Sequence, residues 1–160
     1  MRLVLTSHSL HQEKKMSSGK QIGRYLSYKM AFDRLEESLS EGWLLEALAI
    51  EESIISDRLM SILKSRNIKP NARQSLRGMI EQVKKLLTNT GNLSNDDIFK
   101  ELDDWRHQRN ECIHSLCKPN DESQSERSTE LFNEKLWHTS RKGYILAELT
   151  RDLANQIERS

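Results

Sequence analysis

The chain has 160 residues, a formal charge of +1 and 36% apolar residues. A charge so close to zero argues against a protein that coats nucleic acid through a broad basic surface, because that mode neutralises many phosphates. It leaves room for a small site that contacts a few nucleotides. The 2 prolines and 6 glycines are too few for an all-β fold with many tight turns, so we expect an all-α, single-domain helical bundle.

Membrane attachment and disulfide bonding are not expected. No apolar run approaches the roughly 20 residues that a membrane-spanning helix needs, and residues 1–5 are too short for the apolar part of a signal peptide. We therefore expect a cytoplasmic chain. The 2 cysteines, Cys112 and Cys117, lie on one predicted helix and provide neither a disulfide framework nor a Cys-pair zinc site.

The N-terminal part divides into an arm and two helices. Residues 1–20 are rich in Ser, Lys and His and lack helical periodicity, which predicts a flexible N-terminal arm or an extension upstream of a start at Met16. The helical domain is expected over 21–160, and its first helix over about 21–40, ending near Gly42. The second helix is predicted over about 43–66 because apolar residues recur there at helical spacing: Leu44, Leu48, Ile55, Leu59 and Ile62.

Two further helices follow in the middle of the chain. The third is predicted over about 72–90, between a Pro-Asn pair and Gly91. Ser94 and Asp97 have the spacing of a capping box, in which a serine and a carboxylate satisfy backbone donors at the start of a helix. They open a fourth helix, which we expect to end at about residue 117, before a polar loop over 118–128.

The fifth helix is predicted over about 129–158. Its candidates for the inward face are all aliphatic: Leu131, Leu136, Ile145, Leu146, Leu149, Leu153 and Ile157. We expect the tryptophans Trp43 and Trp105 to anchor the core rather than to stack on nucleobases.

The fourth helix differs from ordinary scaffold. At 100° per residue its apolar side chains fall in one arc: Ile98, Leu102, Trp105, Cys112, Ile113 and Leu116. Arg109 falls near the middle of that arc. Asn110 and His114 are four residues apart, so they lie one turn from each other on an adjoining strip that also carries Asp103 and His107.

An arginine in an apolar stripe cannot lose its charge, so Arg109 needs a carboxylate, a phosphate or water. On the second helix, Glu52 projects into the apolar arc, whereas other charged residues project to its edges: Glu51, Asp57 and Arg58. We therefore predict that Glu52 contacts Arg109 or Arg106. Such a contact would either be a purely structural ion pair or hold an arginine in place for a substrate phosphate.

The run WRHQRNECIH at 105–114 resembles the signature helix of HEPN ribonucleases. That family's pattern is an Arg, often followed by Asn or another polar residue, and then a His after four to six intervening residues. Arg109, Asn110 and His114 fit the pattern, and they lie late in the fourth helix, just before a polar loop. The run at 51–59 in the second helix also resembles small bacterial HEPN proteins, and the whole resemblance extends over about 21–157.

The resemblance implies a metal-independent endoribonuclease, a toxin of a toxin–antitoxin or phage-defence system, that acts on RNA as a homodimer with a composite active site. It implies cleavage that leaves a cyclic phosphate and a 5′-hydroxyl. His114 would deprotonate the ribose 2′-hydroxyl or protonate the leaving oxygen, which suits an imidazole group. Arg109 would hold the scissile phosphate, and Asn110 would orient the imidazole or bind the substrate. Glu52 and Arg106 would support the site.

This chain departs from the family pattern at one position, and the departure concerns inhibition by an antitoxin protein. Some family members carry a tyrosine two residues after the His, which a partner nucleotidyltransferase modifies to silence the toxin. This chain has Leu116 at that position. A cognate antitoxin protein, the partner that the resemblance suggests, would therefore have to act by another route.

Two other interpretations remain open. The chain could be a non-catalytic HEPN-like dimerisation module or nucleotide- or RNA-binding module, or an unrelated bundle with a chance motif. A zinc site would need His107 and His114 with Cys112 and Cys117, but the cysteines project away from the histidines. We therefore expect no metal and no other cofactor.

Overall fold

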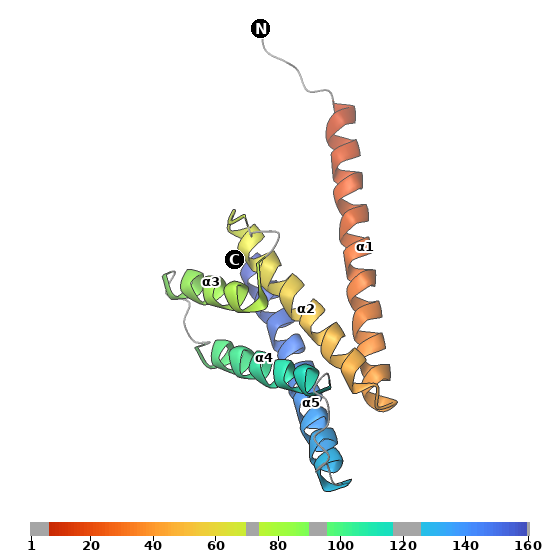
Figure 1. Ribbon diagram of the computed structural model, residues 1–160. Helices are drawn as coiled ribbons and strands as arrows, with labels where there is room; N and C mark the ends of the chain where they lie inside the picture. The colour runs from red at the N-terminus through yellow and green to blue at the C-terminus, as the bar shows by residue number, and fades with distance from the viewer. Residues whose placement is uncertain (1–6, 70–73, 90–95, 117–125, 160) are drawn as a thin grey trace. The chain divides into compact units, whose positions relative to one another are not determined.

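The computed structural model describes residues 7–69, 74–89, 96–116 and 126–159. These residues form five α-helices and no strand: α1 (Ser7–Ser40), α2 (Leu44–Ser65), α3 (Leu76–Asn89), α4 (Asp96–Leu116) and α5 (Glu126–Arg159) (Figure 1). The predicted all-α class is confirmed. By its internal contacts the chain separates into two compact units, Met1–Arg34 and Leu35–Ser160.

The helix ends agree closely with those predicted, but three helix starts differ. Helix α3 begins at Leu76 rather than near residue 72, and α5 begins at Glu126, inside the predicted polar loop. The largest difference is at the start of α1. That helix begins at Ser7, well before the predicted start near residue 21. No proline interrupts 7–40, and each residue added to an existing helix gains a backbone hydrogen bond, so helical periodicity of apolar residues is not required. The predicted cap at Ser94 and most of the polar loop lie outside the described residues.

Two left-handed residues end the first helices. Gly42 has a φ of +76°, and the next amide, that of Trp43, donates to the Ser38 carbonyl at 2.8 Å. After α2, Asn67 has a φ of 57° and donates its amide to the Lys64 carbonyl at 3.0 Å. Both arrangements satisfy carbonyls that a helix end would otherwise leave open. The predicted helix end near Gly42 is confirmed.

In the unit Leu35–Ser160, α5 packs along α2 and also against α4, and α3 packs against α2 and α4 (Figure 1). The core is aliphatic with two large aromatic side chains, Phe99 and Trp105, both on α4. The second helix contributes most of the fully buried aliphatic residues: Leu48, Ile55, Leu59, Ile62 and Leu63. Helix α2 therefore supplies the largest part of the buried core.

The inward face of α5 was predicted only in part. Leu136, Leu146, Leu153 and Ile157 are buried as expected, but three other candidates are exposed: Leu131 (58%), Ile145 (56%) and Leu149 (47%). The buried face is instead completed by small or hydroxyl-bearing residues: Thr139, Ser140, Gly143, Ala147, Thr150 and Ala154. Small residues let the backbone of α5 approach its neighbours closely, so hydrophobicity alone misplaced the face.

Trp105 fixes α4 to α5. Its side chain is fully buried, and its Nε1–H donates to the Thr139 carbonyl at 3.1 Å. About two turns further along α4, Cys112 Sγ lies 3.8 Å from Thr139 Oγ1. The prediction of a core anchor is confirmed for Trp105 and wrong for Trp43, which follows the α1–α2 turn and is 44% exposed.

We predict that Gly143→Ala destabilises the chain. A Cβ at this position would overlap Glu51 Oε2 and lie 2.7 Å from Trp105 Nε1. We expect the free energy of unfolding to fall by about 1–3 kcal/mol, as for other overpacked cores. Urea denaturation would measure it. The matched control is Gly23→Ala, whose Cβ would meet nothing within 4 Å; equal losses in the two variants would contradict the close approach of α5.

Candidate functional site

The predicted contact between the second and fourth helices is present. Arg109, on α4, forms an ion pair through Nη2 with Glu52 Oε2, on α2. The side chains are 21% and 31% exposed, respectively, so the pair lies at the boundary between core and solvent. An ion pair that is partly removed from water is screened less than an exposed pair.

The rest of the Arg109 guanidinium is only partly satisfied. Nη1 donates to Asn110 Oδ1 at 3.0 Å. Nε is buried and has no hydrogen-bond partner within the described part of the chain. Glu52 and Asn110 therefore hold the guanidinium plane in one orientation, while one donor remains for another acceptor.

His114 lies in the last turn of α4 and is exposed. It follows Asn110 by four residues, which places the two side chains on the same strip of the helix. The structure thus brings Arg109, Asn110 and Glu52 into direct contact, and it leaves His114 on the adjoining turn, open to solvent. A planar cation, an amide and an accessible imidazole can together bind a phosphate and transfer a proton.

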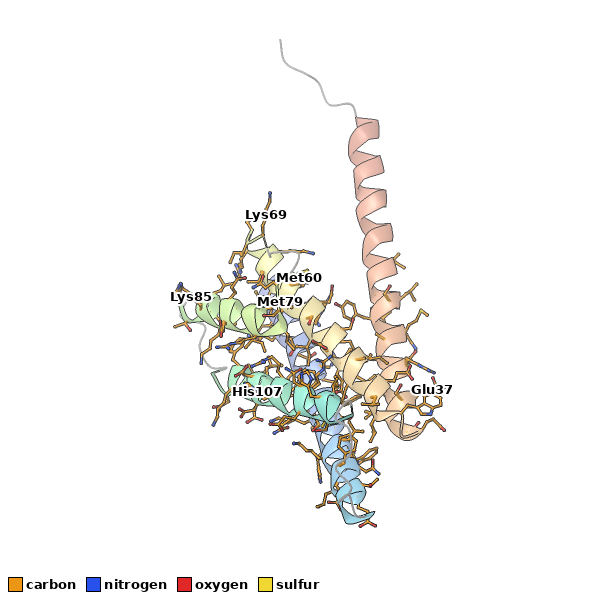
Figure 2. The ribbon with its side chains drawn as sticks, viewed as in Figure 1. Glu37, Met60, Lys69, Met79, Lys85 and His107 are labelled. Carbon is orange, nitrogen blue, oxygen red and sulfur yellow. The ribbon has the colours of Figure 1, made fainter. Side chains whose placement is uncertain are left out.

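Arg106, the other predicted supporting residue, is engaged within α4. Its Nε donates to Asp103 Oδ1 at 2.9 Å, and its Nη2 lies 2.7 Å from His107 Nε2. Among the described residues, Glu52 pairs with Arg109 and not with Arg106. His107, labelled in Figure 2, has a side chain that is 63% exposed. Arg106 therefore belongs to a separate polar cluster one turn before Arg109.

The buried acidic residue of α2 is Glu51, which the helical projection had placed at the edge of the apolar arc. That projection is wrong. Glu51 is 0% exposed, and Glu52 lies at the boundary. Helix α2 packs against both α3 and α5, so its buried face is wider than one apolar stripe. Glu51 does occupy the same helical row as Leu48 and Ile55, but the sequence of one helix does not show how wide its buried face is.

The surroundings of the Glu51 carboxyl group disfavour its ionised form. Neither Oε1 nor Oε2 has a hydrogen-bond partner within the described residues. Burial raises the pKa of Glu51 to about 9, because removal from water disfavours the ionised form. The side chain is therefore uncharged at neutral pH.

Metal ligation finds no support in the residues that the structure describes. They contain no group of three or more His, Cys, Asp or Glu side chains that could hold a metal ion. Cys112 is buried, and Cys117 lies outside the described residues.

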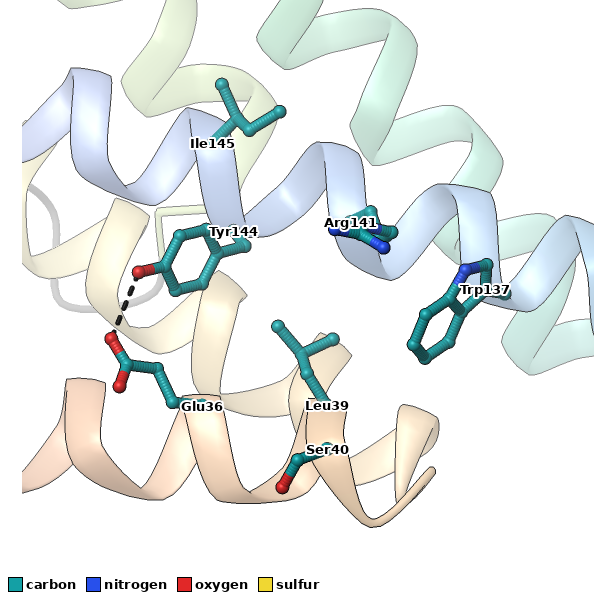
Figure 3. A pocket seen from close by; sticks show the side chains of 7 residues that line it. All are labelled: Glu36, Leu39, Ser40, Trp137, Arg141, Tyr144 and Ile145. Carbon is teal, nitrogen blue, oxygen red and sulfur yellow. Dashed lines mark hydrogen bonds between the residues drawn. The ribbon is translucent and has the colours of Figure 1, made fainter.

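A groove lies on another face of α5, beside the last turns of α1 (Figure 3). It has a volume of about 480 Å³ and seven lining residues: Glu36, Leu39, Ser40, Trp137, Arg141, Tyr144 and Ile145. The Arg141 guanidinium lies 5.4 Å from the centre of the Trp137 ring. At the other end, the Tyr144 hydroxyl donates to Glu36 Oε1 at 3.1 Å. The groove thus combines an aromatic–cation pair with apolar walls.

Comparison with family models, curated proteins and solved structures finds no match to this chain. In the described part of the chain, no helix combines the length and apolar character needed to cross a membrane.

We predict that Glu51 makes stability depend on pH. The folded chain keeps the Glu51 proton up to a pH of about 9, whereas the unfolded chain releases it near 4.5. Raising the pH between these values therefore favours the unfolded state, by about 1.4 kcal/mol per pH unit for this one group. The stability that the protonated Glu51 side chain preserves is therefore fully present below pH 4.5, and it is lost progressively as the pH rises to about 9.

Urea denaturation of wild type and Glu51→Gln at several pH values would measure the effect. The Gln side chain cannot ionise. The unfolding free energy of the wild type should therefore fall relative to that of Glu51→Gln as the pH rises. A difference that does not change between pH 5 and 9 would show that Glu51 titrates normally.

Proposed function

We propose that this chain is a metal-independent endoribonuclease of the HEPN type, a toxin of a toxin–antitoxin or phage-defence system. The observation that carries the proposal is the arrangement of Arg109 on α4. Its guanidinium is held by Glu52 and Asn110, and its buried Nε has no hydrogen-bond partner among the described residues. It lies about one turn from the exposed His114. Ordinary helical scaffold does not require these four side chains together.

The proposed reaction needs no group beyond the side chains and the RNA. The ribose 2′-oxygen attacks the neighbouring phosphorus, and the bond from phosphorus to the 5′-oxygen breaks. The products are a 2′,3′-cyclic phosphate and a 5′-hydroxyl. His114 takes the proton from the 2′-hydroxyl or gives one to the leaving oxygen, and Arg109 stabilises charge on the phosphate oxygens.

The ion pair with Glu52 bears on the number of chains in the site. Arg109 forms an ion pair with Glu52 of its own chain, so the charges of the two side chains offset each other in a single protomer. Two protomers facing each other through α4 would supply two guanidinium groups, and two imidazoles for the acid and base roles. A homodimer with a composite site is therefore part of the proposal, as is inhibition by a cognate antitoxin protein.

We predict that the chain cleaves a mixed RNA pool in EDTA and that both Arg109→Ala and His114→Ala abolish cleavage. Loss of a general acid or base lowers rates by about 10²–10⁴-fold, and loss of a positioned donor by about 10²–10³-fold. Gel analysis with end-group mapping would measure the rate and detect the cyclic phosphate.

The matched controls lie on exposed surfaces of the same unit. His107→Ala removes an exposed histidine of α4, and Arg151→Ala removes an arginine of α5 that is 35% exposed. Both should cleave at close to the wild-type rate. Cleavage that needs added metal, or that survives in His114→Ala, would refute the proposed chemistry.

A non-catalytic nucleotide- or RNA-binding module is the second candidate, and the groove beside α5 favours it. Trp137 is 37% exposed, and Arg141 lies over its ring. Exposed aromatic rings and arginine planes stack on unpaired nucleobases. In this alternative the Glu52–Arg109 ion pair is purely structural.

We predict for this alternative that Trp137→Ala weakens binding of single-stranded RNA about tenfold or more, because base stacking contributes about 1–3 kcal/mol. Fluorescence anisotropy with a labelled oligonucleotide would measure the affinity, and Trp43→Ala is the control on another exposed tryptophan. Equal affinities for wild type and Trp137→Ala, in a chain that cuts RNA, would remove the alternative.

A further inference from the structure

Three helices meet at one buried point. Glu51 of α2, Trp105 of α4 and Gly143 of α5 are so close that a Cβ on Gly143 would overlap Glu51 Oε2 and lie 2.7 Å from Trp105 Nε1. Glu51 and Trp105 are both 0% exposed. The junction therefore has room for the carboxyl group only because α5 carries a glycine there.

Within the part of the chain that the structure describes, Glu51 has no cationic partner at this junction. Trp105 and Gly143, which face it from α4 and α5, carry no charge. The cations nearest in sequence on these two helices are paired with other carboxylates: Arg106 with Asp103, Arg109 with Glu52, and Lys142 with Glu101. On α2 itself, Arg58 lies seven residues on and pairs with Asp57. An ionised carboxylate without a partner is very costly in such a place, so the junction requires Glu51 in its neutral form.

The same two helices also form the Arg109 site. Glu51 and Glu52 are consecutive on α2, and Trp105 and Arg109 are one turn apart on α4. The junction of Glu51 with Trp105 and the ion pair of Glu52 with Arg109 are therefore neighbouring side-chain contacts between α2 and α4, two helices that each pack against α3 and α5. A change in the separation of α2 and α4 at Glu51 and Trp105 would therefore also move Glu52 relative to Arg109.

We infer that Glu51 is a positioning residue, whose uncharged carboxyl group sets the separation of α2, α4 and α5 and thereby holds Glu52 against Arg109. Ionisation would draw water to the carboxylate, and the helices would have to separate to admit it. The Glu52–Arg109 ion pair would then weaken. The link to RNA cleavage rests on the proposed function, whereas the link to the ion pair does not.

The test is a double-mutant cycle between Glu52→Gln and Arg109→Gln, measured by urea denaturation at pH 7 and pH 10. This pH range lies well below the usual pKa of arginine side chains and well above that of ordinary carboxyl groups. We expect the pair to contribute roughly fivefold to the unfolding equilibrium constant at pH 7. In the wild-type background this coupling should be lost at pH 10, and in the Glu51→Gln background it should persist.

The control background is Glu134→Gln, which removes an exposed acidic residue of α5 and should lose the coupling at pH 10 as the wild type does. If Glu51→Gln does not fold, Glu51→Met provides an unbranched side chain that never ionises. A coupling that is equal at pH 7 and pH 10 in the wild type, or that disappears at pH 10 in the Glu51 variants as well, would overturn the inference.

RNA cleavage provides a separate readout. If the chain is a ribonuclease, Glu51→Gln should retain a larger fraction of its pH 7 rate at pH 9.5 than the wild type does, after correction for uncatalysed hydrolysis. A wild type that loses no activity relative to the variant overturns the catalytic link. Absence of cleavage at every pH, together with the expected pH-dependent coupling, refutes the ribonuclease and leaves the positioning role of Glu51 supported.

Discussion

The close approach of α5 to α2 and α4 is the constraint on which the unit Leu35–Ser160 depends. Gly143 allows the α5 backbone to lie against Glu51 and Trp105, and the Trp105 indole donates to a carbonyl of the same helix. Small residues of α5 therefore complete a core whose large side chains come mainly from α2 and α4. Dense packing also makes the positions of α2 and α4 sensitive to small changes in volume.

The electrostatics of the interface follow from that packing. Two consecutive glutamates of α2 have opposite states: Glu51 is fully buried and neutral at neutral pH, whereas Glu52 lies at the boundary and pairs with Arg109. The difference arises from the orientation of successive side chains on a helix, which point about 100° apart. One glutamate thus occupies the core, and the next one orients a guanidinium whose Nε is still unpaired within the described residues.

Much of the fold could be predicted from the sequence, because helical spacing, a glycine after α1 and the shortage of turn residues are local signals. The contact of Glu52 with Arg109 could also be predicted, since a charge in an apolar stripe needs a partner. The burial of Glu51 and the exposure of Ile145 and Leu149 could not. They depend on how many neighbours surround each helix, which a projection of one helix does not contain. Small residues define the inner face of α5, and hydrophobicity gives them little weight.

We propose that α4 presents a site for attack by a ribose 2′-oxygen. The most direct measurement is cleavage of an RNA that carries a single 2′-deoxynucleotide at a mapped cut, compared with the all-ribose strand. If the ribose 2′-oxygen is the nucleophile, cleavage at that bond disappears while the modified strand still competes for binding. Continued cleavage at the deoxynucleotide would show that water, not the ribose, is the nucleophile, and it would contradict the roles given to Arg109 and His114.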